Sequence, residues 1–208
     1  MNITERINHG LDWAGAEWVM WLLLLLSVLV VACVVERWLF MLSRKLELET
    51  VWTKLSALLD SADAKQVDTQ LETARSMEEV VGLSVLKARG GSPAALEDVA
   101  QAAVTAEKLK YNRGLRFLAT TTSNAPFIGL LGTVVGIVQA FAKLATVPAG
   151  ASRSSFIMGS ISEALAATAI GLLVAIPAAA AYNWFQGKVD DCESRSLILT
   201  RRLIARLR

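Results

Sequence analysis

Three long stretches of this chain carry no charged residue, and they set the expected architecture. They cover residues 18–35, 117–142 and 164–187. Each is long enough to cross a hydrocarbon core about 30 Å thick, which takes roughly 20 apolar residues. The pattern therefore predicts an all-α membrane protein with three transmembrane helices, over 18–42, 115–144 and 156–186, and with long helical extensions beyond the spans.

The segment between the first two spans, residues 43–114, is polar and predicts several helices. Apolar residues recur at helical spacing from Val51 to Leu58, and a second helix is expected from Met77 to Lys87. Ser92 followed by Pro93 is a strong signal for the start of a third helix. Because no Gly-Pro pair interrupts the chain before Ala125-Pro126, we expect this helix to continue unbroken into the second span.

The distribution of Lys and Arg predicts the orientation in the membrane. Eighteen of the 21 lie within residues 37–116 and 188–208, and positive charge accumulates on the cytoplasmic side. We expect a periplasmic N-terminal tail (1–17), a cytoplasmic loop (43–114), a periplasmic hairpin (145–155) and a cytoplasmic basic helix (187–208). Since the net charge is only +2, this basic helix is expected to contact anionic membrane lipids and not nucleic acid.

One acidic residue stands out against this background. Glu163 is the only Asp or Glu between Lys108 and Val189, in a run that is otherwise uncharged. A charge near the centre of a membrane helix costs on the order of 2.5–3.5 kcal/mol, so such residues tend to face a protein interior or a water-filled path and mark a function. The alternative is a carboxyl near the membrane surface, because Glu163 falls in the first third of its segment.

Small residues recur at three- and four-residue intervals in the second and third spans. The positions are Ala125, Gly129, Gly132, Thr133, Gly136 and Ala140, and then Ala167, Gly171, Ala175 and Ala179. Such rows let membrane helices approach closely, so we expect these two spans to face protein and the Leu-rich first span to face lipid.

Polar side chains in the second and third spans need shelter from lipid. They are the run 120–124, Thr133 and Thr168, and an oligomer around a shared lumen would shelter them together with Glu163. The alternative for each threonine is a hydroxyl bonded back to its own helix.

Signatures of catalysis are missing from the sequence. It has no phosphate-binding glycine loop, His-x-x-x-His pair, Cys-x-x-Cys motif or nucleophile elbow. With one His and two Cys, we expect no metal, no cofactor and no enzymatic activity. The single histidine, His9, receives no role.

Two segments resemble motifs of the MotA/TolQ/ExbB (ExbB/TolQ) proton-channel family. The first is 125–137, APFIGLLGTVVGI, and the second is 163–172, EALAATAIGL, followed by Ala175-Ile176-Pro177 and Tyr182-Asn183. The resemblance covers roughly residues 115–190. The first span and the loop agree with the family in character and order.

The resemblance implies a subunit of the bacterial inner membrane that assembles as a ring, typically a pentamer, around a central lumen. The lumen would hold a dimer of a single-span ExbD/TolR-like partner, whose membrane Asp carries the proton. Proton flow would then drive periplasmic work such as TonB-dependent import, through a TonB/TolA-like protein.

The resemblance also implies roles for individual residues. Thr133 and Thr168 would line the ion path, and Glu163 would face the lumen toward the periplasmic side. The positions implied for hinges or helix packing are Pro126, Gly129, Gly132, Gly136, Gly171 and Pro177.

Alternative functions stay open. A non-conducting envelope scaffold would use Glu163 as a structural hydrogen bonder, and a stator of the Tol-Pal or gliding type would share the same architecture. A small-solute transporter lacks support because no inverted repeat or broken helix pair is visible, and a flagellar stator is disfavoured because large cytoplasmic insertions are missing. The preference for protons over sodium rests on the resemblance alone.

Overall fold

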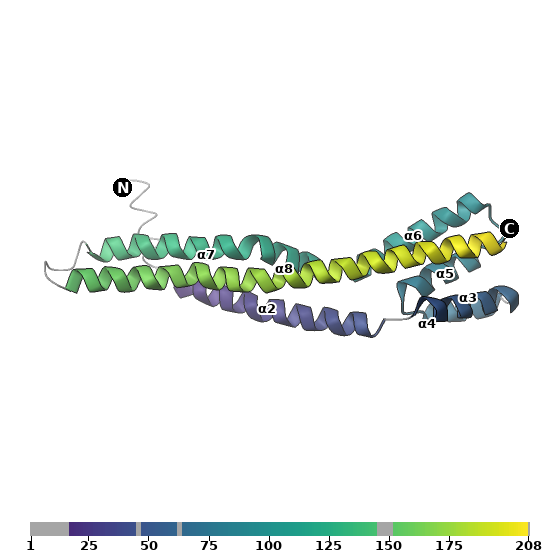
Figure 1. Cartoon of the computed structure of the whole chain (residues 1–208), viewed down its shortest axis with the longest axis horizontal. Coiled ribbons are helices and arrows are strands. Elements are labelled where there is room, and N and C mark those ends of the chain that lie inside the picture. The colour runs from purple at the N-terminus through teal and green to yellow at the C-terminus, as the bar shows by residue number, and fades with distance from the viewer. Residues whose placement is uncertain (1–16, 45–46, 62–63, 145–151, 208) are drawn as a thin grey trace. The chain divides into compact units, whose positions relative to one another are not determined.

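Helices account for nearly all of the described chain in this computed structural model. The described residues are 17–44, 47–61, 64–144 and 152–207. The seven helices of this part of the chain (Figure 1) are α2 (Glu17–Leu42), α3 (Leu48–Ser61), α4 (Ala64–Thr73), α5 (Met77–Lys87), α6 (Pro93–Tyr111), α7 (Leu115–Leu144) and α8 (Ser152–Leu207). The all-helical architecture is confirmed. His9, nearly all of the expected tail and most of the expected hairpin lie outside the described residues.

Three of these helices are long and apolar enough to cross a membrane. The qualifying segments are Glu17–Leu42, Leu115–Ala142 and Met158–Leu207. Helix α8 runs for 56 residues without a break, so the third apolar stretch and the basic C-terminal segment belong to one helix. The prediction of three candidate spans is therefore confirmed by length and composition.

The chain forms two compact units, and both α2 and α8 contribute to each. One, here called the span unit, comprises Met1–Val34 and Arg116–Tyr182. The other, here called the charged unit, comprises Val35–Leu115 and Asn183–Arg208. The apolar stretches thus form one unit, and most of the charged residues form the other.

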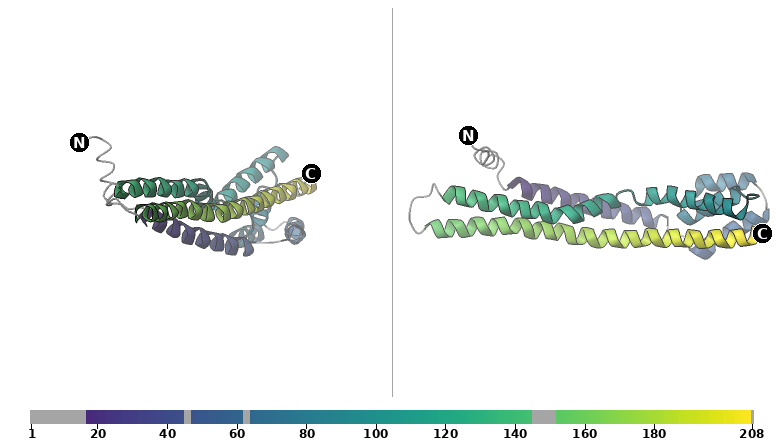
Figure 2. Two further views of the ribbon diagram at one scale, coloured as in Figure 1. Left: turned by 60° about the vertical axis from the view of Figure 1, so that its left-hand side comes forward. Right: turned by 90° about the horizontal axis from the view of Figure 1, so that it is seen from above.

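Within the span unit, α7 and the first half of α8 lie side by side as an antiparallel pair, with α2 packed against them (Figures 1 and 2). The small residues face this contact: Ala125 and Ala140 of α7 and Ala167 of α8 are buried. Helix α2 buries few side chains there, Val19 and Leu23 among them. The small-residue rows therefore form the helix contact that their spacing predicts.

Within the charged unit, α5 is the central element. Eight of its 11 residues are buried, and it contacts α3, α4 and α6. A capping box fixes its start, because the Ser76 hydroxyl accepts from the backbone N–H of Glu79 and the Glu79 carboxylate accepts from that of Ser76. Gly82 lets α3 approach, since a Cβ built there would lie 2.3 Å from Cδ1 of Leu55.

The predicted unbroken helix from Pro93 into the second span is wrong. Ser92 and Pro93 do start α6 as expected, with the backbone N–H of Ala95 donating to the Ser92 hydroxyl. That helix ends at Tyr111, and a turn precedes α7. Gly114 in this turn has a φ of 82°, a conformation that glycine adopts without steric cost and that ends a helix.

Candidate functional site

Two glycines bring the backbones of α7 and α8 into direct contact. A Cβ built on Gly129 would lie 2.8 Å from the carbonyl oxygen of Ala167 and 3.0 Å from Cα of Thr168. A Cβ on Gly171 would lie 2.7 Å from the carbonyl oxygen of Ala125. Any side chain at either glycine would push the two helices apart, so this contact depends on glycine.

The close contact brings Thr133 of α7 and Thr168 of α8 together. The Thr168 hydroxyl donates to Oγ1 of Thr133 at 3.5 Å, and Thr133 in turn donates to the carbonyl of Leu130 at 2.6 Å. Thr133 is therefore bonded to its own helix and also to the neighbouring one. Because a hydroxyl both donates and accepts, this pair can pass on a hydrogen bond or replace a water lost by an ion.

Glu163 lines a cavity of the span unit. The cavity has a volume of about 320 Å³, and its wall includes Gly132 and Ala167, which directly precede Thr133 and Thr168 in the sequence. Glu163 itself is exposed, although the next residue along α8, Ala164, is buried. The carboxylate thus lies at the edge of the helix contact.

A second carboxylate, Glu17 of α2, lines the same cavity as Glu163. The sequence predicts no role for Glu17 beyond its place in the N-terminal tail (1–17). A local signal exists, because Glu17 directly precedes the first apolar residue of its span and occupies the first turn of α2. Its meeting with Glu163 depends on how α2 packs against α7, where a Cβ on Gly132 would lie 3.0 Å from Cγ1 of Val19.

Much of the polar run 120–124 is satisfied within α7 itself. The side chains of Thr120, Ser123 and Asn124 each donate to the carbonyl four residues earlier, at 2.9, 3.2 and 2.9 Å. These three residues therefore do not by themselves require an oligomer. Thr122 differs, since its Oγ1 is buried without a hydrogen-bond partner among the described residues.

The two prolines predicted as hinges lie inside continuous helices, Pro126 in α7 and Pro177 in α8. Because proline lacks an N–H, the carbonyl of Thr122 has no donor from Pro126. The backbone carbonyl of Thr122 therefore lacks its usual N–H donor four residues later. The buried hydroxyl of the same residue has no hydrogen-bond partner among the described residues. Gly136 is half-buried further along the same helix. A hinge role for either proline stays a prediction.

The described residues contain no group of three or more His, Cys, Asp or Glu side chains that could hold a metal ion. The chemistry gathered in the span unit is that of two carboxylates and a pair of hydroxyls. Such groups suit the binding of a proton or a small cation.

Comparison with known proteins gives a family match over most of the chain. The profile of the MotA/TolQ/ExbB proton channel family matches residues 63–196, a range that contains Thr133, Glu163 and Thr168. Glu17 lies outside the matched range.

Curated relatives match over shorter segments. The chain is 45% identical over 100 residues to the Tol-Pal system protein TolQ of Pseudomonas aeruginosa, covering 47% of this chain and 42% of that protein. It is 48% identical over 83 residues to the biopolymer transport protein ExbB of Xanthomonas campestris pv. campestris, covering 40% and 32%. The TolQ of Haemophilus influenzae is 41% identical over 111 residues, covering 49% and 47%. The chain thus spans less than half the length of these relatives, whose names describe transport and Tol-Pal components and not enzymes.

Proposed function

This chain belongs to the MotA/TolQ/ExbB proton channel family, and we propose that it is the ion-path subunit of an inner-membrane motor of the ExbB/TolQ type. The motor would couple the proton-motive force to periplasmic or outer-membrane work such as TonB-dependent import. The observation that supports this most is the pair of hydroxyls, Thr133 and Thr168, held 3.5 Å apart where α7 and α8 touch.

In this proposal the carboxylates and the hydroxyl pair act in sequence. Glu163 and Glu17 bind the incoming ion in the cavity of about 320 Å³, which has room for several waters at about 30 Å³ each. Thr133 and Thr168 then solvate the ion or donate to its next acceptor, a membrane carboxylate of a partner chain. The N-terminus would be periplasmic and the C-terminus cytoplasmic, so that Glu163 lies toward the periplasmic side.

The energy per ion favours repeated sites. Moving one elementary charge through 100 mV releases about 2.3 kcal/mol. A single proton therefore delivers little work, and a ring of identical subunits would add several such steps within one cycle.

Exposed apolar faces of the span unit are available for assembly. Phe127 of α7 is 68% exposed and Leu173 of α8 is 70% exposed, and either lipid or other chains must cover them in a membrane. We expect a homo-oligomer, typically of five copies, around a dimer of a single-span ExbD/TolR-like protein, with a TonB/TolA-like protein as a further partner.

Proton flux into liposomes tests the role of the hydroxyl pair. The complex would be purified from its native membranes, reconstituted around a pH-sensitive dye and driven by a potassium diffusion potential. Thr133→Val should lower the flux about tenfold, since a lost hydrogen bond is worth about 1–1.5 kcal/mol, whereas Thr133→Ser should keep most of it. Thr105→Val changes a hydroxyl that bonds only within α6 and serves as the matched control.

Glu163→Gln separates the motor from a scaffold. The motor predicts that flux disappears while the complex elutes intact from a sizing column. A wild-type complex without flux, and without a copurifying single-span protein, would favour the envelope scaffold instead.

The same purification addresses the driven process. The copurifying proteins, identified by mass spectrometry, would distinguish the ExbB type from a Tol-Pal or gliding motor. Replacing the proton gradient with a sodium gradient in the same liposomes would identify the ion.

A further inference from the structure

A pocket in the charged unit lies where two helices change from apolar to charged. Along α2 the uncharged stretch ends at Val35, and along α8 it ends at Gly187. The pocket has a volume of about 360 Å³ and is lined by residues close to these two points on α2 and α8, together with residues of α5 and α6. This position corresponds to the headgroup layer of a membrane, where helices gain their first charges and carry Trp side chains.

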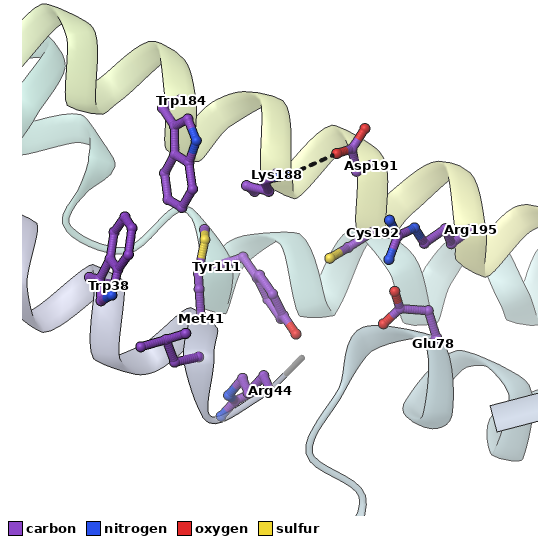
Figure 3. A pocket seen from close by; sticks show the side chains of 11 residues that line it. Trp38, Met41, Arg44, Glu78, Tyr111, Trp184, Lys188, Asp191, Cys192 and Arg195 are labelled. Atoms are coloured by element: carbon purple, nitrogen blue, oxygen red, sulfur yellow. Dashed lines mark ion pairs between the residues drawn. The ribbon is translucent and has the colours of Figure 1, made fainter. Parts of the chain in front are cut away.

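The end of the pocket nearer the apolar stretches is aromatic. Trp38 of α2 and Trp184 of α8 stack with ring centroids 5.0 Å apart and planes inclined by 15°. Figure 3 shows both side chains at one side of the pocket. They are 48% and 44% exposed, so one side of the stacked pair is uncovered. Met41 continues the apolar wall. This surface suits hydrocarbon chains.

Charged side chains line the rest of the pocket: Arg44 lies near Met41, Arg195 lies beside Glu78, and Lys188 lies between Trp184 and Asp191 (Figure 3), with its Nζ 5.8 Å from the Trp184 ring centroid. Lys188 pairs with Asp191 at 3.6 Å, and both side chains are at least half exposed. This loose pair leaves the ammonium able to bind another anion.

Three cations and two carboxylates line the pocket. Arg44 also pairs with Glu107 at 3.9 Å, which leaves Lys188, with its loose pair, and Arg195 as the cations that face an added ligand. An anion is therefore the occupant that suits this part of the pocket.

We propose that this pocket binds an anionic glycerophospholipid, with its phosphate beside Lys188 and Arg195 and its acyl chains along Trp38 and Trp184. Both helices order these groups in the same direction, since on each the aromatic residue precedes the cations in sequence. The volume fits a headgroup and not two acyl chains, which then lie on the exposed faces of the tryptophans. The inference does not depend on ion conduction.

The arginines nearer the C-terminus are engaged differently. Arg202 and Arg206 pair with Glu49 and Asp60 of α3 at 3.2 and 2.9 Å. The lipid contact expected for the whole basic helix is thus assigned to its beginning, around Lys188 and Arg195.

Native mass spectrometry of the delipidated full-length protein tests the site. The protein in detergent is titrated with phosphatidylglycerol, with phosphatidylcholine of identical chains and with glycerol phosphate. Phosphatidylglycerol should bind at least about fivefold more tightly than phosphatidylcholine. Lys188→Ala should weaken its binding about fivefold, and the double variant with Arg195→Ala about 25-fold, at about 1 kcal/mol per cation. Lys188→Arg should keep the affinity, and the exposed Arg201→Ala on the same helix should not change it.

Three results would overturn the proposal. Equal binding of the two lipids would remove the role of headgroup charge. An equal loss in Arg201→Ala would replace the site by nonspecific attraction, and displacement of the lipid by equimolar glycerol phosphate would identify a soluble phosphate ligand instead. Should the double variant fail to fold, the lipid comparison on the wild type and on Lys188→Arg decides the matter.

Discussion

Replacing Gly129 by alanine should separate α7 from α8 and break the hydroxyl pair. The added Cβ would lie 2.8 Å from the carbonyl oxygen of Ala167, whereas an ordinary contact needs at least 3.4 Å. The helices must therefore move apart by about 0.6 Å at this point. Thr133 and Thr168 start at 3.5 Å between their oxygens, and a further separation of this size takes them beyond hydrogen-bond distance.

Two opposing effects set the size of the loss in stability. Overpacking of a tight contact costs about 1–3 kcal/mol, while alanine gains about 1 kcal/mol over glycine in a helix. Gly187→Ala is the matched control, because it lies inside α8 with no atom within 4 Å of its added Cβ. Gly187→Ala should show only the gain in helix propensity and no overpacking. The free energies of unfolding of the two variants should therefore differ by about 1–3 kcal/mol.

The two variants are compared by thermal unfolding of the purified protein in detergent, followed by circular dichroism. At about 2–4 °C per kcal/mol for a chain of this length, Gly129→Ala should unfold at least about 2 °C below Gly187→Ala. Its proton flux should fall about as far as that of Thr133→Val. Equal melting temperatures, or a destabilised variant with normal flux, would refute the argument that this glycine sets the distance between the hydroxyls.

Two further predictions concern the charged unit. Although burial opposes it, the Lys54 ammonium and backbone N–H groups hold the pKa of Glu79 below 4.5, so its stabilising effect is present above pH 4.5 and lost as the pH falls through the lowered pKa. Lys54→Met should therefore melt below the wild type at pH 7, with the gap closing as the pH falls below 4.5 and through the lowered pKa; a gap that does not depend on pH would contradict this ion pair. Gly114→Ala should lose about 1–2 kcal/mol because its φ is 82°, measured by the same melts against Gly187→Ala; a gain in stability would show that the turn between α6 and α7 tolerates a side chain.

Local sequence patterns predicted features that depend on residues within one or two helical turns. Hydropathy located the three spans, and the start of α6 at Ser92 and Pro93 followed from capping chemistry. The break between α6 and α7 was missed, although Gly114 was visible in the sequence. A lone glycine tolerates both a helix and a turn, and the residues that flank this turn, Tyr111 and Leu115, are buried in the tertiary structure.

The residues of the candidate site also fall into two groups: those that local sequence identified and those whose position depends on the tertiary structure. Thr133, Glu163 and Thr168 stood out because polar groups are rare in apolar helices, and small-residue spacing indicated that α7 and α8 touch. Glu17 could not be assigned to the cavity of Glu163, since their meeting depends on the rotation and register of α2 against α7. The polar run 120–124 is weaker evidence for an oligomer than expected, because carbonyls of α7 accept hydrogen bonds from three of its side chains.

Hydropathy, charge bias, caps and small-residue rows belong to single segments, and they determined the spans, the starts of α5 and α6, and the faces of α7 and α8 that pack. Tertiary structure decided which groups come together: Thr133 with Thr168, Glu17 with Glu163 around one cavity, and Trp38 with Trp184. Each of these pairs joins residues at least 35 positions apart. A contact of this kind requires helix registers accurate to a fraction of a turn, and no local preference in the chain specifies them.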